Sequence, residues 1–138
     1  MGKKSKRENR IPKTESPPPI TFSFRFYDDS SLKFCISEWK KEKIALSIQK
    51  LKQINDKTCP ELIKGNETFH FHPVNWEKTV KKTGFPDARA NRLDPFQFAL
   101  PGVNSGKARV YGALGNNIFH IIWFDLNHEI WPSFKKYT

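Results

Sequence analysis

The sequence predicts an α+β fold in which an N-terminal strand, a long helix and a short helix pack on a C-terminal antiparallel sheet. Apolar residues recur at helical spacing in residues 38–54, whereas they alternate with polar residues in 20–26 and 96–100. Two runs rich in β-branched and aromatic residues flank a Gly-Asn-Asn sequence at 115–117, which tolerates the positive φ angles of a tight hairpin turn. A length of 138 residues suits one domain with a modest core.

The first nineteen residues are predicted to form a disordered basic arm. They contain few apolar residues and end in three consecutive prolines. Such an arm either binds nucleic acid or keeps the protein soluble. The contacts in the first case would be Lys3, Lys4, Lys6 and Arg7. The folded domain is expected over residues 20–132, followed by a C-terminal tail at 133–138.

Residues 20–26 are expected to begin the domain as a half-buried strand, because three phenylalanines alternate with polar neighbours. The long helix is expected over residues 38–54, with Ser37 as its N-cap. Its apolar stripe should face the sheet and contains Ile44, Ile48 and Leu51.

A short second helix is predicted after Thr58, because Thr58 and Glu61 have the spacing of a capping box and Gly65 can end the helix. Asn75 can cap a further helical turn. Arg89 and Arg92 stand at near-helical spacing in the loop that follows, where they are candidate nucleic-acid contacts. The alternating residues from Phe96 onwards then form the first of three strands that can pair as an antiparallel meander.

The hairpin around 115–117 carries most of the polar groups that could do chemistry. If its turn has two residues, side-chain parity divides the hairpin into two faces. The apolar face should be the core side and contains Ala108, Val110, Leu114, Phe119, Ile121 and Trp123. The mixed face is where function is expected and contains Lys107, Arg109, Tyr111, His120 and Ile122. A three-residue loop would instead turn His120 toward the core.

The formal net charge of +10 favours polyanionic partners such as RNA or DNA. About +4 lies in residues 1–19 and +6 in the remainder, so the excess is spread over arm and domain. Ordinary solubility charge is the simpler explanation. The sequence has neither a membrane-spanning apolar run nor a signal region, which predicts a cytoplasmic protein without a membrane partner. Cys35 and Cys59 lack the spacing of a metal motif and are expected to be reduced thiols.

The order of elements resembles the RelE/ParE-like toxin superfamily over residues 20–125. Members of that superfamily fold as a first strand, two helices and a terminal antiparallel sheet. The resemblance implies a bacterial toxin with metal-independent ribonuclease activity and an antitoxin-like protein partner. The side chains of the expected types on the matching strands are Lys107, Arg109, Tyr111 and His120.

The end of the chain is similar to an uncharacterised bacterial family, which implies a shared fold and no activity. That family has an R-V-x-G strand and a W-x-D-x-x-H-x-x-aromatic-Pro ending. The matching residues are Arg109, Val110, Gly112, Trp123, Asp125, His128, Trp131 and Pro132.

Three functional hypotheses follow. A ribonuclease without a cofactor would use Arg109 or Lys107 for the phosphorane charge, and His120 with Tyr111 for the proton transfers. A metal hydrolase would recruit residues that no zinc-site spacing links: His70, His72, Asp125 and His128. Asp125 and His128 are better explained as caps of the last strand and its turn. A noncatalytic module would use the basic surface to hold nucleic acid or an acidic protein.

Overall fold

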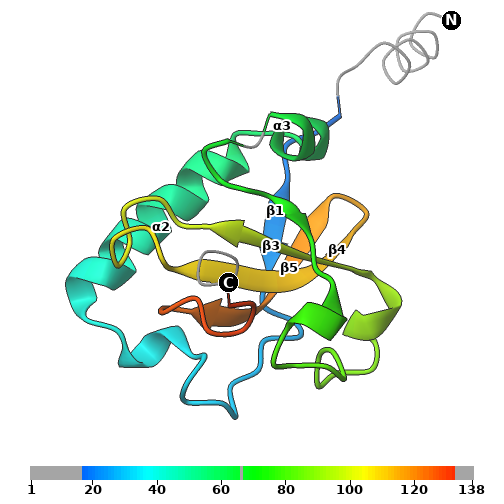
Figure 1. The fold of residues 1–138 in the computed structure, drawn as a ribbon. Coiled ribbons are helices and arrows are strands. Elements are labelled where there is room, and N and C mark those ends of the chain that lie inside the picture. The colour runs from blue at the N-terminus through cyan, green and yellow to red at the C-terminus, as the bar shows by residue number, and fades with distance from the viewer. Residues whose placement is uncertain (1–16, 66, 133–138) are drawn as a thin grey trace, which may run out of the picture.

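The computed structural model describes residues 17–65 and 67–132. The predicted arm contacts Lys3, Lys4, Lys6 and Arg7, and the tail at 133–138, therefore lie outside the described residues. Within them the chain has the predicted α+β fold (Figure 1). Its helices are α2 (Lys41–Asn55) and α3 (Cys59–Lys64), with short 3-10 turns η1 (Ile36–Glu38), η2 (Trp76–Lys78) and η3 (Ala90–Arg92).

The five strands form one sheet in the order β1-β5-β4-β3-β2. They are β1 (Thr21–Ser23), β2 (His72–Pro73), β3 (Asp94–Ala99), β4 (Arg109–Gly115) and β5 (Ile118–Asp125). The predicted antiparallel meander of β3, β4 and β5 is confirmed. β1 joins β5 in parallel, so the sheet is mixed, and β1 and β2 form its two edges.

The long helix differs from its prediction in its start and in one face. Residues 36–38 form a 3-10 turn, and α2 begins at Lys41 without a side-chain cap, so Ser37 is not its N-cap. Trp39 is extended and buried between the two elements, and this anchors the chain before the helix starts. Ile48 is 56% exposed, because the face toward the sheet runs instead through Ser47, Leu51 and Ile54.

The short helix forms as predicted. The hydroxyl of Thr58 accepts a hydrogen bond from the backbone nitrogen of Glu61, and the Glu61 carboxylate accepts one from the backbone nitrogen of Thr58. These reciprocal bonds satisfy two amide donors that a helix start leaves unpaired. Gly65 is the C-cap. Asn75 likewise caps η2 through the backbone nitrogen of Glu77.

The first strand is shorter than the predicted span of residues 20–26. β1 ends at Ser23, and Phe24 is 58% exposed after it, although Phe26 is buried again. The chain turns here because Tyr27 donates its backbone N–H to the carbonyl of Phe24. After the turn the backbone nitrogen of Asp28 donates to the carbonyl of Ile122 at 3.2 Å, so this segment stays beside β5.

A β-bulge in the hairpin changes the predicted faces. Tyr111 pairs with Trp123, yet Gly112 pairs with Ile121, so Ile122 is an extra residue on β5. The prediction that Trp123 shares the face of Val110 is therefore wrong. Trp123 packs with Tyr111, and Phe124 packs on the Val110 side instead.

Both faces of the sheet are covered. On one face α2 and α3 bury a core that includes Phe98, Val110 and Phe119. On the other, Tyr111 and Trp123 are buried under loops that precede η1, surround η2 and η3, and follow β5. The mixed face predicted to be functional is therefore largely a second core, and Tyr111 is fully buried within it.

Both cysteines are free thiols. In the described part of the chain, neither helix has the length and apolar character needed to cross a bilayer.

Candidate nucleic-acid interface around His120

The hairpin turn has two residues, Asn116 and Asn117, with φ angles of 51° and 66°. Gly115 pairs with Ile118 across the turn, which confirms the parity on which the position of His120 depends. The Asn117 side chain donates to the carbonyl oxygens of Pro18 and Pro19 at 3.2 and 2.8 Å. These two hydrogen bonds attach the segment before β1 to the hairpin turn, and β1 then pairs with β5.

The parallel pairing of β1 with β5 places Ser23 opposite His120. The Ser23 hydroxyl oxygen accepts a hydrogen bond from the backbone nitrogen of Arg25 at 3.1 Å and lies 3.0 Å from Nδ1 of His120. A hydroxyl that already accepts from an amide has its proton available for Nδ1. This arrangement favours the tautomer in which the outer nitrogen, Nε2, carries the proton.

His120 is partly exposed and lies against the ring of Phe26, with ring centroids 4.8 Å apart. Two guanidinium groups lie near the same ring, Arg25 at 5.4 Å and Arg89 at 5.0 Å from its centroid. We call Ser23, Arg25, Phe26, Arg89 and His120 the His120 surface. Its two cations come from segments more than sixty residues apart in the sequence, and the Phe26 ring positions both.

The surroundings of His120 favour the neutral form of its imidazole. Burial lowers the pKa of His120, and the nearby Arg25 lowers it further. Asp87 binds Arg89 through two contacts, at 3.1 Å to Nε and 2.8 Å to the terminal nitrogen. Those hydrogen bonds lower the pKa of Asp87 to about 2. Arg89 is thereby held in place. Arg25 forms no salt bridge with the residues described, although its charge also lowers the pKa of Asp87.

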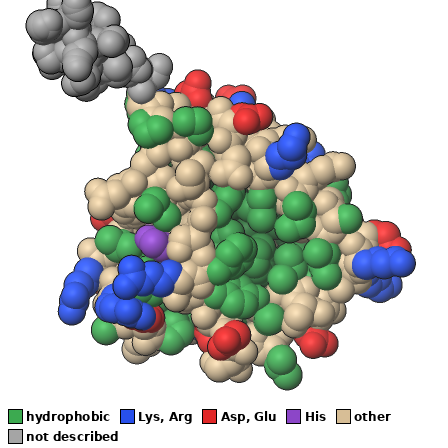
Figure 2. All heavy atoms as spheres, turned by 180° about the vertical axis from the view of Figure 1, so that it is seen from behind, with side chains coloured by type: hydrophobic (Ala, Val, Ile, Leu, Met, Phe, Trp, Pro, Cys, Tyr) green, Lys and Arg blue, Asp and Glu red, His purple; other side chains and the backbone are tan. Residues whose placement is uncertain are grey.

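Figure 2 shows a histidine and several basic side chains gathered at one side of the face turned away from the viewer in Figure 1. Hydrophobic side chains occupy the middle of that face. The exposed apolar residues of the described chain include Phe24 and Ile48.

The structure does not assemble the four predicted catalytic residues around one point. His120 pairs with Ala113 near the hairpin turn, whereas Arg109 pairs with Asp125 at the other end of β4. A terminal nitrogen of Arg109 donates to the carbonyls of Gly106 and Ala108, at 2.8 and 3.1 Å.

The other two predicted catalytic residues stand in contrasting surroundings. Tyr111 is fully buried, and its hydroxyl has no hydrogen-bond partner within the described chain. Burial raises the pKa of this phenol far above its usual value. Lys107 is exposed in the loop before β4. The mixed face therefore presents one accessible imidazole, that of His120. Tyr111 is buried on the same face, and Arg109 lies at the other end of β4.

The two predicted nucleic-acid contacts that the structure describes, Arg89 and Arg92, lie in different surroundings. Arg89 belongs to the His120 surface, and Arg92 is exposed at the end of η3. Arg25, Ser23 and Phe26 were not singled out from the sequence. Alternation in residues 20–26 marks Ser23 and Arg25 as one polar face, but no sequence signal indicates that this face meets His120.

The metal hypothesis gains no support from the described residues, which contain no group of three or more potential metal ligands. His70 is exposed, and His72 lies 3.4 Å from the side-chain nitrogen of Gln97. The Asp125 carboxylate accepts hydrogen bonds from the backbone nitrogens of Glu129 and Ile130, at 2.9 and 2.8 Å. The predicted capping role of Asp125 is confirmed.

No protein-family model, curated protein or solved structure matches this chain.

Proposed function

We propose that the protein binds single-stranded RNA through the His120 surface. The observation that carries this proposal is the placement of Arg25 and Arg89 around Phe26, beside a partly exposed imidazole. Arginine is suited to phosphate because its planar guanidinium offers several donors. The buried Phe26 ring holds both guanidiniums beside the imidazole. The favoured tautomer of His120 adds an Nε2–H donor for a phosphate oxygen.

The net charge supports the same function, because a chain of +10 attracts polyanions over its whole surface. RNA is preferred to DNA here on the resemblance in element order to RelE/ParE-like toxins. The second core argues for binding without catalysis, since burial of Tyr111 removes the phenol from any substrate.

Binding can be tested by fluorescence anisotropy with short labelled RNA and DNA strands over a range of salt concentrations. The Arg25→Ala/Arg89→Ala double variant should bind more weakly. Its slope of log affinity against log salt should fall by about 0.7 for each phosphate contact removed. The matched control is Lys52→Ala/Lys64→Ala, which removes the same charge from exposed sites on α2 and α3. Equal losses in both variants, or no binding to RNA or DNA at low salt, would refute the proposal.

Metal-independent RNA cleavage is a second candidate, and the neutral, partly exposed imidazole of His120 favours it. His120 would take the proton of a 2′-hydroxyl, whose oxygen attacks phosphorus while the 5′-oxygen leaves and is protonated by water. This role requires the other tautomer, with Nδ1 donating to Ser23. Arg25 and Arg89 would stabilise the negative charge on the phosphorane.

Cleavage predicts products that end in a 2′,3′-cyclic phosphate, and their loss in His120→Gln. If the ribonuclease is a toxin, its expression should arrest bacterial growth. Co-expression of an antitoxin-like partner should relieve the arrest, and expression of the His120→Gln variant should not cause it. RNA that stays intact with purified protein, both alone and with ribosomes, would leave binding as the function.

A further inference from the structure

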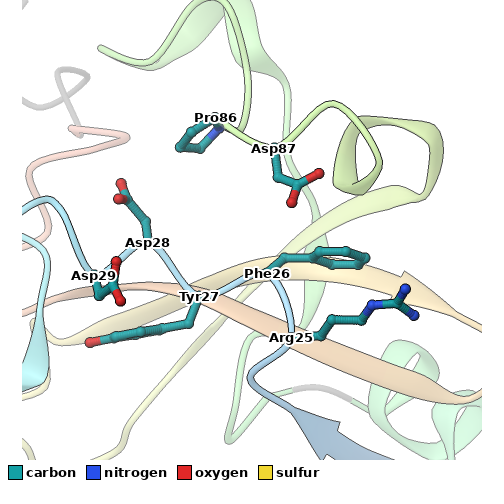
Figure 3. A pocket seen from close by; sticks show the side chains of 7 residues that line it. All are labelled: Arg25, Phe26, Tyr27, Asp28, Asp29, Pro86 and Asp87. Atoms are coloured by element: carbon teal, nitrogen blue, oxygen red, sulfur yellow. The ribbon is translucent and has the colours of Figure 1, made fainter.

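An open pocket of about 230 Å³ adjoins the His120 surface. Its lining comes from residues 25–29 and from two residues before η3, Pro86 and Asp87 (Figure 3). Sites that enclose drug-sized ligands occupy about 300 to 1,000 Å³. The smaller space here suits one planar ring system that enters from an open side.

The pocket has carboxylates on one side and a cation on the other. In Figure 3, Asp28 and Asp29 lie at one end, Arg25 lies at the other, and Asp87 points in from above. Two of the three carboxylates are already engaged. Asp28 accepts from the indole nitrogen of Trp123 at 2.8 Å, and Asp87 binds Arg89.

Asp29 differs because its carboxylate makes no hydrogen bond or ion pair with any residue the structure describes. It is exposed at the mouth of the pocket, so its oxygens can accept from a ligand. In Figure 3 the Pro86 ring lies above the pocket and the Tyr27 ring below it, while the buried Phe26 ring lies beside Arg25. A flat ligand between these surfaces would present its edge to Asp29.

We propose that this pocket holds one unpaired nucleobase of the bound RNA, with guanine preferred. The proposal rests on the RNA-binding function above. Guanine presents two adjacent N–H donors on its Watson–Crick edge, which match the two oxygens of a carboxylate. Adenine and cytosine each place an acceptor nitrogen beside their amino group, and uracil has one donor between two carbonyls, so each would bring an acceptor against Asp29.

Arg25 links the pocket to the phosphate-binding surface, because it lines the pocket and also lies over Phe26. A nucleotide with its base in the pocket would have its phosphate toward Arg25 and Arg89. The free carboxylate repels phosphate, so the same charge that selects the base edge keeps the backbone out of the pocket.

The test uses heptanucleotides of uridine with one central guanosine, adenosine, cytidine or inosine, measured with the full-length chain. The guanosine strand should bind about tenfold more tightly than the adenosine or cytidine strand, with inosine between them because it lacks the amino donor. Asp29→Asn should reduce the guanosine-to-adenosine ratio to about one. Asp56→Asn removes the same charge at an exposed site after α2 and should keep the ratio.

The ratio is the readout because removing any acidic charge raises affinity for all RNA alike. Equal binding of all four strands would overturn the pocket proposal and leave RNA binding intact. No binding of any strand would refute the RNA-binding function itself. A lysine- or arginine-rich peptide that binds the protein and loses affinity in Asp29→Asn, without any guanosine preference, would assign the pocket to a cationic protein partner instead.

Discussion

Substitution of Gly112 by alanine should destabilise the protein more than any other exchange of one glycine for alanine in the described hairpin and loops. Gly112 stands at the bulge where the pairing of β4 with β5 shifts. A Cβ atom at this position would overlap the carbonyl oxygen of His120 and lie 2.5 Å from Cε1 of Phe119. The new methyl group would overlap a backbone carbonyl of β5 and a buried aromatic ring. Neither group can shift without moving the residues packed around it.

The expected cost follows from those contacts. Overpacking of a well-packed core costs about 1 to 3 kcal/mol, and separating the strands at His120 also weakens a ladder hydrogen bond worth about 1 kcal/mol. We therefore expect a loss of about 3 kcal/mol in the free energy of unfolding. The matched control is Gly106→Ala, where the new methyl group meets nothing within 4 Å and the φ angle of +82° alone opposes alanine. That strain costs about 1 to 2 kcal/mol.

Urea denaturation followed by tryptophan fluorescence, to which the buried Trp123 contributes, measures both variants. Gly112→Ala should lower the denaturation midpoint clearly more than Gly106→Ala. Because the clash displaces His120, it should also weaken RNA binding in the protein that remains folded. Equal stabilities of the two variants would refute the close approach of β4 and β5 at the bulge.

Three further predictions concern single side chains. Tyr111→Phe should leave the unfolding free energy unchanged or raise it by about 1 kcal/mol, because the lost hydroxyl is buried without a partner in the described chain; calorimetry would contradict this with a clear loss. Because burial lowers the pKa of His120 below its usual value of 6.5, stability should fall as the pH drops below 6.5. In pH-dependent urea titrations His120→Gln should flatten that fall, and an unchanged fall would contradict the lowered pKa. Thr58→Ala should cost about 1 kcal/mol in thermal unfolding by removing the capping box, whereas the exposed Thr83→Ala should cost almost nothing.

Local signals in the sequence predicted local structure well. The tight hairpin turn within residues 115–117 and the Thr58 capping box are each set by a few neighbouring residues, and both are confirmed. The α+β class followed from the periods of the apolar residues. In each case the deciding interactions lie within four residues along the chain.

Errors arose where distant residues decide the structure. Trp39 packs into the core and delays the start of α2, which displaces the expected Ser37 cap. One extra residue, Ile122, reverses parity in the second half of β5 and moves Trp123 to the other face. No alternation pattern shows a bulge, because the residues on both faces of this strand are apolar.

The sequence predicted only part of the candidate site, because residues distant along the chain meet there. Parity correctly placed His120 on the mixed face, and Arg89 was singled out as a nucleic-acid contact. The meeting of Arg25, Phe26 and His120 depends on the parallel pairing of β1 with β5 across the whole chain. That pairing has no signature in the sequence, so Arg25 was missed while the buried Tyr111 was chosen.

The most direct test of the account is an NMR titration of the histidine imidazoles with and without single-stranded RNA. Phosphate bound at the His120 surface favours the imidazolium form, so RNA should raise the pKa of His120 from its lowered value. At fixed pH the imidazole resonances of His70, which lies outside the His120 surface, should keep their chemical shifts when RNA is added. RNA that binds yet leaves the His120 titration unchanged would contradict the assignment of the binding surface.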